Sequence, residues 1–226
     1  MKNSVALLFL FILCSSCEPK KSPIEIEKEV FGEIFAEVLD SIYMDRRLFL
    51  QFPPAPKMVF DKNGNFIKED TTDLSLKKKI FKKQIKAIQS DTLDIKIAVN
   101  PTLTPIKKTD QTIFNTIFKN KTILFSDTLQ NITIDINTLK HTKLDKIIST
   151  QQFPRFEINE IFSKNSSLKI TGIYTFSRIY FNESYNYGIL EAGYYCGGKC
   201  GEGYLIYIKK IKNLWRVYKT EPTWIS

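Results

Sequence analysis

The sequence contains very little histidine, methionine and thiol. Its 226 residues include one histidine, His141, and three methionines, and two of the four cysteines lie within the first 17 residues. These counts disfavour metal sites with several histidine ligands, and we expect neither a bound metal nor another cofactor. A Ser-His-Asp or Cys-His triad would have one possible base. Beyond a short apolar stretch near the N-terminus, no segment reaches the roughly 20 residues that a membrane-spanning helix needs.

The overall composition is typical of a globular protein. Hydrophobic residues make up 43% of the chain and charged residues 25%, which argues against disorder, coiled coils and collagen-like repeats. A chain of this length can form one large domain or two small ones. We expect a leader over residues 1–16, a lipidated tether over 17–23 and one α+β domain over 24–226. A sub-domain boundary near residue 155 is left open.

The N-terminus has the pattern of an export signal. Met1-Lys2-Asn3 precedes an unbroken apolar run from Val5 to Leu13, which is too short to span a bilayer. The following Cys14-Ser15-Ser16-Cys17 resembles the lipobox of bacterial lipoproteins, except that Cys14 stands where that family usually has leucine. The resemblance implies cleavage before Cys17, attachment of diacylglycerol to its sulfur, and acylation of its amine with a fatty acid such as palmitate.

Two or three acyl chains on one residue would anchor the protein firmly. We therefore expect a lipid-anchored protein of the cell envelope, on the outer membrane and facing the periplasm. The alternative is a plain secreted protein cleaved near Ser16.

Hydrophobic periodicity predicts an α+β fold. Ser22-Pro23-Ile24-Glu25 is a capping box that opens an amphipathic helix reaching about Tyr43, whose polar face carries Glu27, Glu29, Glu33 and Glu37. Asn63-Gly64 predicts a hairpin between residues 58–60 and 66–67. Further helices are expected at about 74–89 and 108–119, and further strands at 94–99 and 132–136. Four late strands are expected to form an antiparallel meander: 168–181, 187–195, 204–210 and 215–219.

Cys196 and Cys200 are the only thiols left once the leader is removed and Cys17 is acylated. In the oxidising compartment outside the inner membrane, a disulfide between them is the default. The glycines around them are interpreted as allowing the positive φ angles of a tight loop. The alternative is a thiol-redox or copper-handling pair, for which His141 would be the only histidine, although we expect this polar-flanked residue to lie on the surface.

The segment around these cysteines resembles the C-terminal part of uncharacterised lipoproteins from Gram-negative bacteria. The similar stretches are FSRIYFN (176–182), YGIL (187–190), YYCGGKCGEGYLIYIKK (194–210) and NLWRVYK (213–219). They combine a Cys-Gly-Gly-x-Cys-Gly loop with a following hairpin. The resemblance implies a pair of antiparallel hairpins and no known activity.

Nine of the ten tyrosines lie between residues 174 and 218. Aromatic residues are enriched at recognition surfaces, so the first functional hypothesis is a non-enzymatic binding module whose tyrosine-rich sheet contacts an envelope protein or a glycan. The residues chosen for this surface are Tyr174, Tyr187, Tyr194, Tyr204 and Tyr207. A weaker alternative is a hydrolase that uses Glu191 or Glu202, which would require a pocket around one of these carboxylates.

Lysine accounts for 28 of the 33 basic residues, and the formal net charge is +9. Arginine is scarce and the expected compartment lacks nucleic acid, so a nucleic-acid partner is not expected. The dense lysines of residues 77–86 are interpreted either as a solvated helix face or as a contact to anionic lipid headgroups. Three Asp-[Ser/Thr]-apolar triplets resemble a bacterial O-glycosylation sequon, in which Thr92 and Thr128 are better candidates than Ser41.

Overall fold

A mixed seven-stranded sheet forms the centre of the computed structural model, which describes residues 21–49, 51–92, 94–106, 117–118, 130–139, 146–153 and 169–226. The strand order is β11-β10-β9-β7-β3-β6, and β8 also pairs with β9. The strands are β3 (Lys96–Val99), β6 (Lys146–Ser149), β7 (Ile170–Phe176), β8 (Tyr180–Phe181), β9 (Tyr187–Gly197), β10 (Cys200–Ile211) and β11 (Leu214–Ile225).

The α+β class is confirmed, but the simple four-stranded meander is wrong. The late strands β7, β9, β10 and β11 are antiparallel neighbours in chain order. However, β3 pairs in parallel with both β7 and β6, so two earlier strands extend the sheet beyond the meander. The expected first late strand is also divided into β7 and β8.

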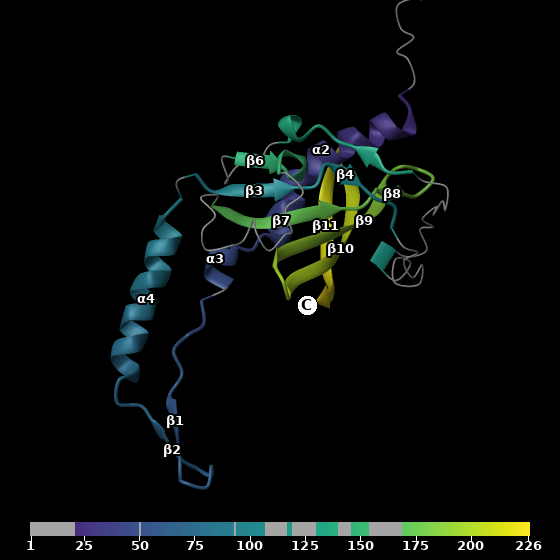
Figure 1. Ribbon diagram of the computed structural model, residues 1–226. Coiled ribbons are helices and arrows are strands. Elements are labelled where there is room, and N and C mark those ends of the chain that lie inside the picture. The colour runs from purple at the N-terminus through teal and green to yellow at the C-terminus, as the bar shows by residue number, and fades with distance from the viewer. Residues whose placement is uncertain are drawn as a thin grey trace, which may run out of the picture.

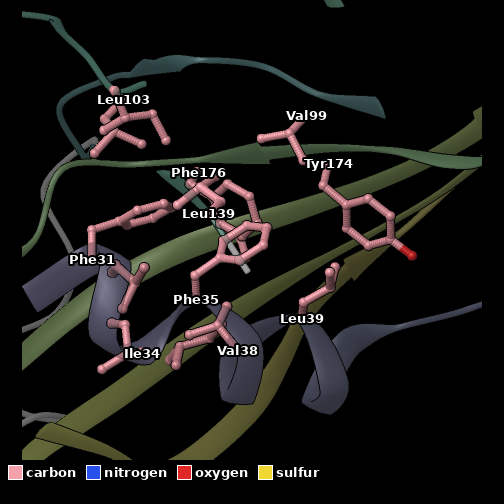
Figure 2. Close-up of a cluster of buried hydrophobic side chains, with 14 of the residues drawn as sticks. Phe31, Ile34, Phe35, Val38, Leu39, Val99, Leu103, Leu139, Tyr174 and Phe176 are labelled. Carbon is pink, nitrogen blue, oxygen red and sulfur yellow. The ribbon is translucent and has the colours of Figure 1, made fainter. Parts of the chain in front are cut away.

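The long helix α2 (Pro23–Ile42) covers one face of this sheet (Figure 1). Its capping box is confirmed: the Ser22 hydroxyl accepts from the Glu25 amide at 3.3 Å, and the Glu25 carboxylate accepts from the Ser22 amide at 2.7 Å. Figure 2 shows the helix side chains Phe31 and Phe35 directed toward Phe176 of β7. Their ring centroids lie 5.3 and 5.9 Å from that of Phe176, so the phenylalanines pack edge to face.

The core under α2 draws on both halves of the chain. Phe31, Val99, Tyr174 and Leu190 belong to one buried cluster. Burial of such a cluster is the main favourable term in folding, so residues before and after position 155 stabilise each other.

Three of the four glutamates assigned to the polar face of α2 instead accept hydrogen bonds from strand β11 or from the β7–β8 connection. Glu27 is 3% exposed and accepts hydrogen bonds from Arg178 of the β7–β8 connection. Glu33 and Glu37 accept from the backbone amides of Trp215 and Val217, at 2.8 and 2.9 Å. Because β11 is an edge strand, these carboxylates occupy amides that would otherwise be open to pairing with another chain.

A separate arm, residues 51–92, projects from this body (Figure 1). It leaves the short helix α3 (Arg46–Phe49), forms the hairpin β1 (Lys57–Phe60) and β2 (Phe66–Asp70), and returns through helix α4 (Leu74–Ser90) to β3. The predicted hairpin and helix are thus confirmed, with Gly64 at φ 84° in the turn. At its base, an Arg47 guanidinium nitrogen donates to the Asp91 carbonyl at 3.0 Å.

Smaller elements complete the described chain. β4 (Thr102–Leu103) pairs with β5 (Ile132–Thr133), and the 3₁₀ turns η2 (Ile136–Thr138) and η3 (Thr150–Gln152) follow. The expected strand 132–136 is only two residues long because the Asp135 side chain accepts from the Asn137 amide and starts η2.

Several sequence predictions fall on residues without a description. The leader, Cys17, Thr128 and His141 lie outside the described residues, and of the helix expected at 108–119 only residues 117–118 are described, as helical. Within the described ranges, no helix is both long and apolar enough to cross a bilayer.

Candidate functional site

The predicted tyrosine surface is wrong for three of its five members. Tyr174, Tyr194 and Tyr207 are each 0% exposed, while Tyr187 and Tyr204 are half-buried. Tyr174 and Tyr194 belong to the cluster beneath α2, whereas Tyr207 belongs to a cluster with Ile189 on the opposite sheet face. Buried rings on both faces cannot form one recognition surface.

The buried phenols are held in their neutral form. Burial is the main reason that the pKa of Tyr174, Tyr194 and Tyr207 is raised above its ordinary value. The Tyr194 hydroxyl donates to the Thr171 carbonyl and the Tyr207 hydroxyl donates to the Glu221 carboxylate, both at 3.1 Å. These hydroxyls therefore satisfy the polar end of each buried ring.

Cys196 and Cys200 lie at bonding distance in a disulfide, with their Cα atoms 5.1 Å apart. They flank the two-residue turn between β9 and β10. Cys196 is 2% exposed and belongs to the cluster beneath α2, which shields its sulfur from a redox partner. A structural bond is therefore the role that this environment favours.

The predicted role of the glycines near the cysteines is confirmed for one of them. Gly197 alone among them has a positive φ, of 122°. Gly201 and Gly203 lie within β10 and are covered by the indole of Trp224: a Cβ at Gly203 would lie 1.9 Å from the indole nitrogen. Their lack of a side chain makes room for that ring.

Trp224 also lines a hollow, together with Gly193, on the sheet face opposite α2. One row of directly paired residues crosses four strands, in the order Thr175, Gly193, Gly203 and Trp224. Side chains of paired residues share a face of the sheet, so the Trp224 indole extends over the bare backbone of Gly203, and the Thr175 hydroxyl lies beside Gly193. The hollow has a volume of about 320 Å³, at the lower end of the range for small-molecule sites.

The walls of the hollow are mostly polar and include four aromatic residues, of which Phe176 and Tyr204 pack with the cluster beneath α2. The Tyr195 and Trp224 ring centroids lie 5.7 Å apart, and Glu191 lies on the other side of Gly193 in the same alternating series. Within the described part of the chain, Glu191 is the only charged residue of the lining, which consists of Thr104, Thr175, Phe176, Ser177, Glu191, Ala192, Gly193, Tyr195, Tyr204, Thr223 and Trp224. The hollow therefore offers aromatic faces together with hydroxyl and carboxylate groups.

The predicted carboxylates do not meet in this hollow. Glu191 lines it, but Glu202 is paired with Tyr194 and so projects on the α2 side, where it accepts a hydrogen bond from Tyr204. Ser177 is not an available nucleophile, because its hydroxyl donates to the Arg178 carbonyl and accepts from the Glu191 amide, both at 2.8 Å. These side chains do not form a catalytic arrangement for hydrolysis.

The remaining described candidates lie elsewhere. Thr92 is exposed at the base of the arm, and the Ser41 hydroxyl donates to the Val38 carbonyl within α2. Among the residues that the structure describes, no three His, Cys, Asp or Glu side chains gather in a way that could hold a metal ion. Comparison of the chain with protein-family models, with curated proteins and with solved structures finds no match.

Proposed function

We propose that the chain is a non-enzymatic binding protein of the bacterial cell envelope, anchored by acyl chains on Cys17, whose hollow binds a neutral glycan. The observation that carries the proposal is the lining of the hollow, which brings the rings of Tyr195 and Trp224 together with Thr175 and Glu191. A concave site of this size suits a sugar unit better than the flat face of an envelope protein.

The lining matches the two kinds of surface that a sugar presents. One face of a sugar ring consists of C–H bonds, which pack against an aromatic ring such as Trp224 or Tyr195. Its hydroxyls can donate to the Glu191 carboxylate and accept from the Thr175 hydroxyl. With Glu191 as the charged group of the described lining, a neutral glycan fits better than an anionic one.

Replacing Trp224 with alanine is expected to weaken oligosaccharide binding about tenfold or more, the loss that about 1.4 kcal/mol of stacking implies. Ile225→Ala is the matched control: Ile225 is the next residue of β11, is 76% exposed, and projects on the opposite face of the strand. Isothermal titration with soluble oligosaccharides of N-acetylglucosamine and of glucose measures both variants. If neither oligosaccharide binds the unaltered protein, or if both variants lose the same affinity, the glycan proposal is wrong.

Replacing Cys17 with serine is expected to abolish acylation and move nearly all of the protein from the membrane fraction to the soluble fraction, since no acyl chain would remain to hold it. Cys14→Leu, which restores the usual lipobox, is expected to leave acylation intact. Intact mass and membrane fractionation in a Gram-negative host measure both. An unacylated wild-type chain, or loss of the acyl group only on changing Cys14, would contradict anchoring at Cys17.

A further inference from the structure

The arm carries apolar side chains that the body does not cover. None of the 17 residues of α4 is buried, and Leu76 and Ile80 are 59% and 48% exposed. In the adjoining hairpin the rings of Phe60 and Phe66 pack against each other yet remain more than half exposed. These exposed apolar side chains are gathered on one segment that projects from the body, and exposed apolar side chains that gather in this way point to an interaction site.

Helix α4 also carries a dense positive charge. It contains six lysines and no acidic residue. Five of the lysines recur at three- and four-residue spacing on one side of the helix and, together with Ser75, line a shallow groove: Lys78, Lys79, Lys82, Lys83 and Lys86. Leu76 and Ile80, four residues apart, lie along the edge of this lysine row, and the sixth lysine, Lys77, lies three residues before Ile80.

We propose that the arm, residues 51–92, docks on a membrane surface of anionic lipid headgroups. A helix with one apolar side and one lysine-rich side lies in the interface of a bilayer, with its apolar side at the acyl boundary. Lysine stems follow the apolar surface while their ammonium groups reach the headgroups. The charge of the arm is complementary to anionic lipid, and each lysine near such a surface contributes about 1 kcal/mol.

The projection of the arm agrees with this role. The hairpin and α4 extend away from the sheet (Figure 1), so they can meet a flat surface before the body does. The proposal does not depend on the glycan site, which lies on the sheet. It does not require the acyl anchor either, although an anchor at Cys17 would raise the local concentration of the arm at the membrane.

The first test is co-sedimentation with vesicles. A chain from Glu18 to Ser226 keeps every described residue and removes the apolar leader, which would bind lipid by itself. We expect it to bind vesicles of phosphatidylcholine containing phosphatidylglycerol, and to bind pure phosphatidylcholine vesicles far more weakly. Replacing Lys78, Lys82 and Lys86 together with glutamine is expected to weaken binding on the order of 100-fold, as about 1 kcal/mol for each lost charge implies.

The matched control removes the same charge from exposed positions of the body, with Lys199, Lys210 and Lys212 replaced by glutamine. This variant is expected to bind as the unaltered chain does. Equal losses in the two triple variants would mean that net charge rather than the arm attracts the protein, and would overturn the proposal. So would binding of the unaltered chain to nucleic acid or a soluble acidic protein without binding to vesicles.

The second test asks whether the apolar side enters the bilayer. Ile80→Trp places an indole on the apolar side of α4, and Lys79→Trp places one on the basic side. With the signal of the unaltered chain subtracted, the indole emission of Ile80→Trp is expected to shift to the blue and to be quenched by brominated lipid acyl chains. The indole emission of Lys79→Trp is expected to show neither effect. Equal behaviour of the two indoles would contradict the proposed orientation even if the vesicles sediment the protein.

Discussion

Replacing Arg178 with alanine is expected to lower the free energy of unfolding by about 3–5 kcal/mol, because it leaves the buried carboxylate of Glu27 without its counter-charge. The Arg178 guanidinium contacts both carboxylate oxygens of Glu27, at 2.6–2.9 Å, and the two side chains are 6% and 3% exposed. A loss of this size is a large share of the 5–15 kcal/mol that stabilises a typical domain. Urea unfolding followed by circular dichroism measures it.

Arg216→Ala is the matched control for this prediction. Its pair with Glu37, at 3.1 Å, also joins α2 to the sheet, but the two side chains are 41% and 39% exposed. Water screens such a pair, so its loss is expected to cost no more than about 1 kcal/mol. Similar losses in the two variants would show that the Glu27–Arg178 pair is not desolvated in solution.

A double variant separates the charge from the packing. Glu27→Gln combined with Arg178→Met removes both charges and retains an oxygen that can accept from the Ile179 amide, which now donates to Glu27 at 2.7 Å. Much of the stability lost in Arg178→Ala is therefore expected to return. No recovery would point to lost packing as the cause.

The protein is expected to lose stability steeply above pH 10. Tyr174, Tyr194 and Tyr207 have pKa values raised above the ordinary value, chiefly by burial. Below about pH 10 these phenols are neutral in both states, so their stabilising contribution is fully present. Above it the unfolded chain releases protons that the folded chain retains, so the free energy of unfolding falls with rising pH until the folded pKa values are reached.

Each buried phenol contributes about 1.4 kcal/mol to this loss between pH 8 and pH 11, so the three together lower stability by about 4 kcal/mol. Urea unfolding at the two pH values measures the difference. Tyr207→Phe is expected to reduce this loss by about 1.4 kcal/mol, whereas Tyr185→Phe, which changes an exposed ring, serves as the matched control. Phenolate absorbance that corresponds to ionisation of all ten tyrosines, while the near-ultraviolet circular dichroism stays native, would contradict the buried neutral state.

Local sequence patterns were sufficient to predict α2, α4 and the β1–β2 hairpin, because caps, turns and periodicity act over a few residues. The buried position of Glu27 also had a local signal: it lies four residues before Phe31 and three before Val30, on the apolar side of the helix. Because Glu27 is charged, it was wrongly placed on the polar, solvent-facing side of the helix. Its partner Arg178 is 151 residues away, and no local pattern links the two.

The parallel pairing of β3 with β6 and β7 could not be predicted from the sequence for a similar reason. β3 pairs with β7 across about 70 intervening residues, and the short apolar segment 94–99 fits an antiparallel or a parallel neighbour equally well. Only packing of the assembled sheet decides between them.

The row of residues beside the hollow depends on β-bulges on both sides of β10. From the pair Gly197–Cys200, an uninterrupted hairpin would place Gly203 opposite Tyr194. A bulge between Cys200 and Gly201 shifts the pairing by one residue, so Gly203 lies opposite Gly193. A one-residue slip moves side chains to the other face of a strand, and the sequence alone did not reveal this bulge.

The contact of Arg47 with Asp91 also bears on how the chain can change over evolution. The arm leaves and rejoins the body at adjacent points. For the folding of the sheet it is therefore equivalent to one closed loop. The entropy cost of closing a loop rises by only about 0.6 kcal/mol for each doubling of its length. The length and charge of the arm can therefore vary with little effect on the folding of the sheet, and selection can adjust the two parts of the molecule separately.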